Sequence, residues 1–371
     1  MSRCLQLAQK AAGHTSPNPL VGAVIVKNGK LLAGGYHHKA GLPHAEIEAL
    51  KKISFRAEGA TLYCNLEPCF HHGRTPPCVH PIIKSGIKRV VIAHRDPNPL
   101  VAGRSVRLLK KSGIQVTEGV LEKEARHLNR FFLTWVTKKR PYVILKAGVS
   151  LDGKIAGGKK WITSPPSRRR VHQLRSQVDA ILVGAHTIRT DNPRLNVRGI
   201  KGAKQPLRII LGSRRQIPVN ARIFAGIQPC PPENLDSRLR GNDRLMFFRG
   251  ALPTLMRKLA RRNVTSILVE GGAKVFASFI KNSLCDELIL FIAPKILGPS
   301  ALDVFPPSLL KKFPFKISSI TPSGPDLEVR FGTKKKGAIA KACQNANKDA
   351  KTNRLIREWQ GFDEKADGEW K

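Results

Sequence analysis

The sequence predicts an α/β protein built from two domains, and three observations support this. A chain of 371 residues exceeds the usual size of a single domain core. Short apolar runs that suit strands alternate with stretches of helical spacing, which is typical of layered α/β folds. The pair Arg140-Pro141 interrupts the alternation, and a second strand-rich set begins at Tyr142. We therefore expect one domain over residues 1–140 and another over residues 141–332.

The first domain is expected to alternate strands with short helices. Leu5, Ala8 and Ala12 indicate one face of a first helix. Asn28-Gly29 is a strong hairpin signal between two apolar runs. The expected strands cover residues 21–26, 31–36, 61–66 and 89–94, and the other expected helices cover residues 44–52, 81–85, 106–111 and 122–136.

The second domain is expected to contain mainly buried parallel strands, because its apolar runs are short and aliphatic. The runs expected to be buried parallel strands cover residues 180–183, 207–211 and 266–269, and further strands are expected over residues 142–147, 288–293 and 328–331. Residues 228–244 are polar and rich in Pro, Asn and Arg, which predicts an inserted surface loop. Residues 333–371 are polar without a clear period and predict a disordered or loosely helical tail.

Composition excludes several classes of protein. No run of eighteen apolar residues exists, so we expect no membrane span, and the N-terminus lacks a signal-peptide pattern, which favours the cytoplasm. Seven widely spaced cysteines do not form a disulfide framework. The net charge of +39 indicates attraction to polyanions. Basic runs are few and no aromatic residues interleave with them, so we expect a basic surface rather than a nucleic-acid-binding protein.

Four residues in the first domain predict a catalytic zinc site. His44 begins an expected helix, and Cys69 and Cys78 supply two thiolates, so three of zinc's four usual ligands are present. The open position holds a water molecule, whose pKa a catalytic zinc lowers toward neutrality. Glu46 lies close enough to exchange protons with this water and with a leaving amine. The order His-x-Glu, Pro-Cys, Cys is the signature of zinc nucleobase deaminases. A chance match and a structural zinc site are the alternatives.

The spacing between the cysteines carries a more specific resemblance. The intervening stretch is Phe70-His71-His72-Gly73-Arg74-Thr75-Pro76-Pro77, where a two-residue spacer is commoner. Together with Pro17-Asn18-Pro19-Leu20-Val21-Gly22 and Asp96-Pro97-Asn98-Pro99-Leu100-Val101-Ala102-Gly103, it resembles the bifunctional deaminase-reductase family of riboflavin biosynthesis. The resemblance covers roughly residues 5–332.

This resemblance implies a first domain with the three-layer α/β/α fold of cytidine deaminases. The implied reaction is hydrolytic deamination of 2,5-diamino-6-(5-phosphoribosylamino)pyrimidin-4(3H)-one to 5-amino-6-(5-phosphoribosylamino)uracil, a phosphoribosylated pyrimidine. A guanidinium binds two phosphate oxygens at once, which suits Arg74 to the ribose phosphate. Taken alone, Asp96 and Asn98 would suggest a turn between prolines. The substrate residues implied by the motifs are Asn18, His37, His71, Arg74, Asp96 and Asn98.

The second domain carries further family motifs, in residues 146–156, 161–164, 187–193 and 269–273. They resemble a reductase domain of dihydrofolate-reductase-like α/β fold that uses NADPH to reduce the ribosyl chain to ribityl. The implied substrate positions are Lys159, Arg175, Leu195, Arg198 and Glu270. The implied cofactor positions are Gly148, Trp161, Thr187, Asp191, Ser213, Gly271 and Gly272, with Asp191 also the candidate for an orienting role.

The second half departs from the family pattern in three places. The loop before Trp161 is short, Lys159 stands where a serine is usual, and residues 228–244 have no counterpart. A monofunctional deaminase with an impaired reductase domain is therefore the first alternative. The second is a nucleic-acid-binding deaminase, suggested by the charge. The resemblance also leads us to expect a homo-oligomer that binds one zinc ion per deaminase site.

Overall fold

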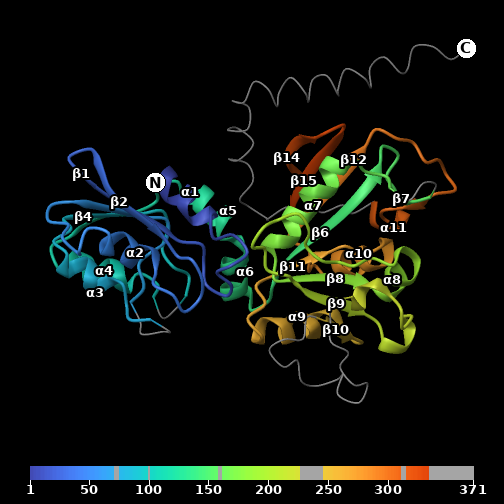
Figure 1. Ribbon diagram of the computed structural model, residues 1–371, viewed down its shortest axis with the longest axis horizontal. Coiled ribbons are helices and arrows are strands. Elements are labelled where there is room, and N and C mark those ends of the chain that lie inside the picture. Colours follow the sequence, from blue (N-terminus) through green and yellow to red (C-terminus); the bar gives the residue numbers. More distant parts are fainter. Residues whose placement is uncertain (71–74, 99–100, 158–160, 226–244, 311–314, 334–371) are drawn as a thin grey trace, which may run out of the picture. The chain divides into compact units, whose positions relative to one another are not determined.

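The protein, seen here in a computed structural model, is described for residues 1–70, 75–98, 101–157, 161–225, 245–310 and 315–333 (Figure 1). It divides into two compact units. One unit comprises Met1–Ile144 with Arg169–Leu284, and the other comprises Leu145–Arg168 with Cys285–Lys371. The expected domain boundary after residue 140 stays a prediction. The predictions for residues 228–244 and 334–371 lie outside the described residues.

A five-stranded sheet forms the first part of the chain, in the order β2-β1-β3-β4-β5. Strand β1 pairs antiparallel with β2 and β3, whereas β3, β4 and β5 run parallel. The strands are β1 (Gly22–Lys27), β2 (Lys30–Tyr36), β3 (Thr61–Cys64), β4 (Arg89–Ile92) and β5 (Gln115–Thr117). The helices are α1 (Ser2–Gln9), α2 (Ala45–Lys51), α3 (Val79–Lys84), α4 (Arg104–Lys111), α5 (Glu122–Leu128) and α6 (Arg130–Lys138).

Helices cover both faces of this sheet, as two neighbouring glycines show. A Cβ added at Gly34 would lie 3.1 Å from the Leu7 side chain of α1. A Cβ added at Gly35 would lie only 2.6 Å from backbone atoms of Ala45 and Ala49 in α2. Since consecutive residues of a strand point to opposite faces, α1 and α2 lie on opposite sides. The expected three-layer α/β/α arrangement is confirmed.

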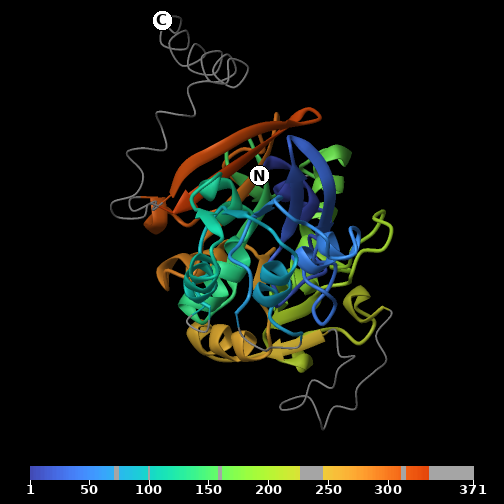
Figure 2. The same cartoon turned by 90° about the vertical axis from the view of Figure 1, so that its left-hand side faces the viewer.

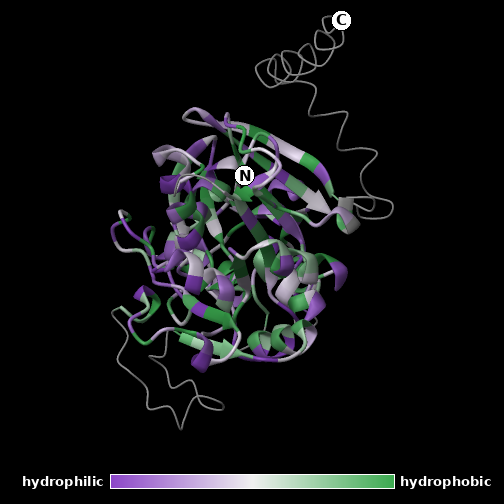
Figure 3. Ribbon diagram, turned by 90° about the vertical axis from the view of Figure 1, so that its right-hand side faces the viewer, coloured by the Kyte–Doolittle hydropathy of each residue, from purple (hydrophilic) through white to green (hydrophobic). Residues whose placement is uncertain are grey.

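An eight-stranded sheet forms the second part, in the order β10-β9-β8-β11-β6-β12-β15-β14. Strands β10, β9, β8 and β11 are parallel neighbours, and β8 and β11 are buried along their whole length. Apolar residues are frequent along the inner strands (Figure 3). The strands are β6 (Tyr142–Ser150), β8 (Ala180–Gly184), β9 (Leu207–Leu211), β10 (Leu245–Phe248), β11 (Ser266–Val269), β12 (Glu287–Ala293), β14 (Phe315–Ser323) and β15 (Asp326–Thr333).

Helices and two short strands complete this part. Strand β7 (Lys154–Ala156) pairs with β13 (Leu302–Asp303). Strands β14 and β15 form a long antiparallel hairpin, drawn in red in Figure 2. The helices are α7 (Pro165–Gln177), α8 (Ala185–Asp191), α9 (Leu252–Arg261), α10 (Ala273–Lys281) and α11 (Pro307–Leu310), with 3-10 turns η1 (Arg214–Gln216) and η2 (Arg222–Phe224). No helix in the described part of the chain combines the length and apolarity that crossing a bilayer requires.

Two expectations about elements need correction. The single helix expected over residues 122–136 is two helices, α5 and α6, which meet at Asn129. The Asn129 side chain is held by the backbone of Leu20, accepting from its N–H at 2.7 Å and donating to its carbonyl at 3.0 Å. The last expected strand is longer than residues 328–331, so Thr333 belongs to β15 rather than to the tail.

Candidate functional site

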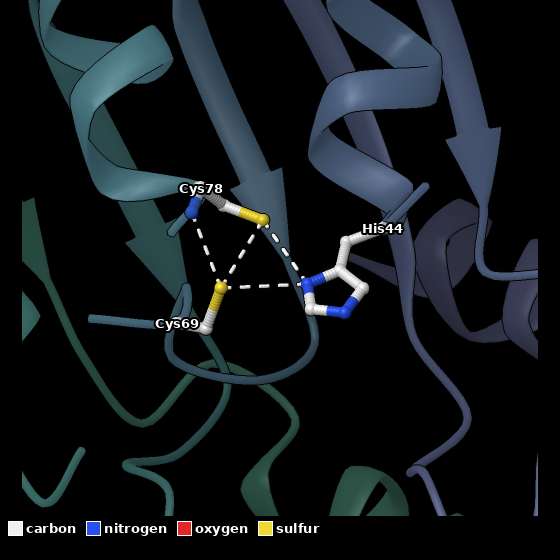
Figure 4. A group of neighbouring side chains, drawn as sticks. All are labelled: His44, Cys69 and Cys78. Atoms are coloured by element: carbon white, nitrogen blue, oxygen red, sulfur yellow. Dashed lines mark hydrogen bonds between the residues drawn. The ribbon is translucent and has the colours of Figure 1, made fainter. Parts of the chain in front are cut away.

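His44, Cys69 and Cys78 bring three donor atoms together at one side of the five-stranded sheet (Figure 4). His44 directly precedes α2, Cys69 follows β3, and Cys78 directly precedes α3. The Nδ1 atom of His44 lies 3.1 Å from the Cys78 sulfur and 3.4 Å from the Cys69 sulfur. The two sulfur atoms are 3.4 Å apart. Residues from three loop ends thus form one compact nitrogen–sulfur cluster.

This cluster fits a zinc ion in both chemistry and size. Zinc binds sulfur at about 2.3 Å and nitrogen at about 2.0–2.1 Å, which places tetrahedral ligand atoms roughly 3.5–3.8 Å apart. The observed 3.1–3.4 Å separations require only a small outward movement of the side chains. The other ring nitrogen of His44, Nε2, lies 3.3 Å from the Thr75 hydroxyl, which helps to orient the ring.

The protein also favours a thiolate at Cys69. A hydrogen bond from the Cys78 thiol and contact with the His44 ring lower the pKa of Cys69 to about 4. The backbone N–H of Cys78 donates to the Cys69 sulfur at 3.1 Å. Metals bind the thiolate rather than the thiol, so this cysteine is prepared for a metal ion.

Glu46 lies in the first turn of α2, two residues after His44, and is only 3% exposed. Burial raises the pKa of its carboxyl to about 7, although neighbouring His44 opposes the shift. Its Oε2 atom is buried and has no hydrogen-bond partner in the described part of the chain. A carboxyl that is half protonated near neutral pH is suited to both accepting and donating a proton.

Asn18 and His37 lie beside this cluster, as the sequence predicts. The His37 ring lies edge-on to the His44 ring, with centroids 5.1 Å apart. Its Nδ1 lies 3.1 Å from the Pro43 carbonyl, so Nδ1 carries the hydrogen and Nε2 accepts from the Asn18 amide at 3.0 Å. Burial lowers the pKa of His37, which agrees with a neutral ring. The pair presents oriented dipoles next to the metal ligands.

Asp96 and Asn98 form the turn that follows β4. The Asp96 carboxylate accepts the Asn98 backbone N–H at 2.8 Å. Burial raises the pKa of Asp96 to about 6, and the charges of Glu67 and Cys69 contribute to this shift. Asp96 and Asn98 therefore form the expected turn, and this turn also lies near the metal-ligand cluster. His71 and Arg74 lie outside the described residues.

Glu67 is not among the predicted site residues, but it holds this turn in place. Glu67 is 3% exposed and directly precedes Pro68-Cys69. Its carboxylate accepts backbone N–H groups from Asp96 at 3.2 Å and Gly103 at 2.9 Å, and from Val106 at 3.3 Å. An acidic residue two positions before the predicted ligand Cys69 is visible in the sequence, but its three backbone partners are not.

The structure also gathers the predicted reductase substrate residues. Arg175 on α7 forms a two-pronged ion pair with Glu270 at 2.6 and 2.9 Å, and both side chains are largely buried. The backbone N–H of Arg198 donates to His172 Nδ1 at 3.2 Å. The Arg175 guanidinium also donates to the Asn196 carbonyl at 3.1 Å, which brings Arg175 beside the segment that carries Leu195 and Arg198. Leu195 is buried in this region, and Lys159 lies outside the described residues.

The predicted cofactor residues divide between the two units. Thr187 and Asp191 lie in α8 after β8, Ser213 precedes η1 after β9, and Gly271 and Gly272 link β11 to α10. All five follow the carboxyl ends of neighbouring parallel strands, the usual place for ligands in α/β sheets.

Gly148 and Trp161 belong to the other unit. A Cβ added at Gly148 would lie 2.9 Å from the Thr163 side chain, so only glycine fits there without a shift. The Trp161 ring is 56% exposed, and the guanidinium of Arg168 lies 4.9 Å from its centre.

Comparison with known proteins covers both halves of the chain. A family model described as the RibD C-terminal domain matches residues 141–329, and a model of the cytidine and deoxycytidylate deaminase zinc-binding region matches residues 1–94. The riboflavin biosynthesis protein RibD of Aquifex aeolicus is 45% identical over 310 residues, which cover 80% of this chain and 87% of that protein.

Two solved structures are similar to this protein over most of the chain. Acinetobacter baumannii RibD has a TM-score of 0.80 and 35% identity, covering 90% of this chain and 98% of its own. A Thermotoga maritima protein, described as a diaminohydroxyphosphoribosylaminopyrimidine deaminase and 5-amino-6-(5-phosphoribosylamino)uracil reductase, has a TM-score of 0.80 and 39% identity, covering 90% of this chain and 97% of its own.

Proposed function

Because this chain belongs to the RibD family of bifunctional deaminase-reductases in riboflavin biosynthesis, we propose that its two sites act in sequence on one substrate. The chain is a zinc-dependent deaminase and an NADPH-dependent reductase that acts on a phosphoribosylated pyrimidine. The first site converts 2,5-diamino-6-(5-phosphoribosylamino)pyrimidin-4(3H)-one to 5-amino-6-(5-phosphoribosylamino)uracil. The second site reduces the ribosyl chain of that product to ribityl.

One observation carries the deaminase mechanism: Glu46, two residues after His44 of the cluster, has a buried carboxyl oxygen that no residue described by the structure contacts by a hydrogen bond. These three residues hold zinc, which supplies Lewis-acid activation of water when bound. Glu46 accepts a proton from the attacking water. It returns that proton to the amino group at ring carbon 2, so the carbon–nitrogen bond breaks and ammonia leaves. Burial, which raises the pKa of this carboxyl in the metal-free protein, favours a group that can both take and return a proton.

The surrounding residues orient the pyrimidine. The neutral His37 ring and the Asn18 amide form a fixed hydrogen-bonded pair beside His44. The Asp96–Asn98 turn is anchored by Glu67 and therefore presents a second fixed edge. Arg74 and His71 are retained as substrate residues on the family motif alone, with Arg74 pairing the ribose phosphate.

The reductase site is supported by the group around Arg175. Reducing ribosyl to ribityl adds a hydride and a proton, and NADPH supplies the hydride. The protein must then hold the sugar phosphate in place. The Glu270 carboxylate fixes Arg175, and Arg175 contacts the carbonyl of Asn196 in the segment that carries Arg198, the second guanidinium proposed for the phosphate. Leu195 is itself buried in this segment. Lys159 is retained on its position in the motif.

One experiment tests the whole scheme. Purified protein is incubated with the diaminopyrimidine substrate, with and without NADPH, and products are identified by mass spectrometry. Without NADPH we expect one amino group to be replaced by oxygen, with release of ammonia. With NADPH we expect two further hydrogens in the product. Deamination without any reduction would instead support a monofunctional deaminase.

We also propose that the chain works in the cytoplasm as a homo-oligomer that does not bind nucleic acid. Family resemblance supports the assembly, and the scarcity of basic runs supports the absence of nucleic acid despite the charge of +39. Light scattering coupled to gel filtration measures the oligomeric state, and a monomer would contradict the proposed homo-oligomer. Non-specific phosphate contacts weaken steeply with salt. RNA binding that persists at physiological salt would therefore contradict the proposal that the protein does not bind nucleic acid.

A further inference from the structure

A cavity of about 530 Å³ opens at the carboxyl edge of the parallel strands β8, β9 and β10. Its volume falls in the range of about 300–1,000 Å³ that small-molecule sites usually have. Two glycines keep it open. A Cβ at Gly212 would lie 2.7 Å from the Ala185 side chain, and a Cβ at Gly250 would lie 3.2 Å from the Phe248 ring. Both glycines have positive φ, so other residues would be strained there.

The charge around this cavity is strongly positive. Arg189 on α8, Arg249 after β10 and Lys274 on α10 line it from three different elements. None of the three makes an ion pair with a residue that the structure describes, and the described lining contains no aspartate or glutamate. Three cations that converge without a counter-charge suit a ligand group with more than one negative charge. Apolar side chains, including Phe248, complete the lining and suit a flat ring.

The strand order indicates which part of NADPH would reach this cavity. Gly271 and Gly272 lead from β11 into the first turn of α10, where backbone N–H groups favour a pyrophosphate. Strands β8, β9 and β10 then follow one another outward from β11 along the same edge. We place the pyrophosphate of the dinucleotide at the start of α10. If the cofactor then extends along this edge, its adenosine half lies over β8 to β10. NADPH differs from NADH there by a 2′-phosphate of about two negative charges near neutral pH.

We propose that Arg189, Arg249 and Lys274 bind the 2′-phosphate of the NADPH adenosine and determine the preference for NADPH over NADH. The three residues come from different elements around the same sheet edge. Their backbone positions are therefore set before the cofactor binds, which lowers the cost of recognition. This inference takes the identity of the cofactor, NADPH, from the proposed reductase function. Its test measures cofactor binding and therefore does not depend on reductase activity.

The test measures equilibrium binding of NADP⁺, NAD⁺ and 2′,5′-ADP by calorimetry to wild type and to Arg189→Gln, Arg249→Gln and Lys274→Gln. We expect each substitution to weaken NADP⁺ and 2′,5′-ADP roughly tenfold, the usual scale for a lost charge-assisted hydrogen bond, and to leave NAD⁺ within about twofold. Lys281→Gln is the matched control, because Lys281 is exposed on α10 outside the cavity lining. Thermal melting monitors the fold of each variant.

Two results would overturn the proposal. Equal weakening of NADP⁺ and NAD⁺ would mean that the cations contact the pyrophosphate that both cofactors share. Unchanged binding of 2′,5′-ADP in all three variants would remove the cavity from cofactor recognition. Arg249→Lys provides a second measurement: a retained preference for NADP⁺ over NAD⁺ is expected, because a lysine keeps the charge.

Discussion

The carboxyl of Glu46 combines burial, a raised pKa and an oxygen without a hydrogen-bond partner among the described residues, and this combination makes its role testable by one substitution. Glu46→Gln keeps the size of the side chain and removes the exchangeable proton. We expect deamination to fall by about 10²–10⁴-fold, the usual contribution of a general acid–base group, while zinc content stays at wild-type level. Ammonia release and metal analysis measure the two quantities.

A control on the same helix separates this role from a general effect on α2. Glu48 is also acidic and lies in the first turn of α2, but it is only half-buried. Glu48→Gln should retain near wild-type deamination. Retained ammonia release by Glu46→Gln would remove the proposed proton transfer.

The same side chain predicts how stability depends on pH in the metal-free protein. Burial raises the pKa of Glu46 from 4.5 to about 7, so the folded state holds its proton more strongly than the unfolded state. As pH rises from 4.5 to 7, the unfolded chain ionises first and the folded state loses stability. Relative to wild type, metal-free Glu46→Gln should therefore gain up to about 3 kcal/mol over this interval. Urea unfolding of both proteins across this pH range measures the difference, and a pH-independent difference would contradict it.

Among the elements of the fold, the connection between β4 and α4 depends on one carboxylate. Glu67 accepts three backbone N–H groups from this connection and from the start of α4. In Glu67→Gln the amide nitrogen would face donors, and hydrogen bonds to a charge are worth about 1.5–3 kcal/mol each. We expect unfolding free energy to fall by about 3 kcal/mol, and KM for the diaminopyrimidine to rise because the Asp96–Asn98 turn loosens.

Urea unfolding and steady-state kinetics measure these two effects. Glu124→Gln on α5 is the control, because this side chain is exposed. A stability loss without any change in KM would show that Glu67 supports the fold but does not position the substrate edge.

The elements also show which features a single sequence predicts well. Long aliphatic runs such as Ala180–Gly184 and Ser266–Val269 are recognisable because burial on both faces requires them. Strand β5 is only Gln-Val-Thr and gives no such signal, and β14 is mostly polar because it lies at the edge of its sheet. The break at Asn129 depends on a bond to Leu20, a partner more than a hundred residues away.

The residues of the site also divide into those that the sequence predicts and those that only the fold brings together. His44, Glu46, Cys69 and Cys78 were predictable because zinc chemistry restricts residue type and order. The role of Glu67 was not predictable, because its partners lie 29 to 39 residues away and only the fold brings them together. The basic cavity was equally hidden, because Arg189, Arg249 and Lys274 share no motif and meet only through the strand order.

For the molecule as a whole, the two chemistries use side chains on different sheets. The zinc cluster and Glu46 lie around the five-stranded sheet, whereas Arg175, Glu270 and the basic cavity lie around the eight-stranded sheet. Removing zinc with a chelator should therefore abolish deamination and leave the reduction of supplied 5-amino-6-(5-phosphoribosylamino)uracil near its initial rate. NADPH absorbance follows the reduction, ammonia release follows the deamination, and added zinc should restore the latter. A parallel loss of both rates would mean that the reductase site depends on the metal, which no contact among the described residues of that site suggests.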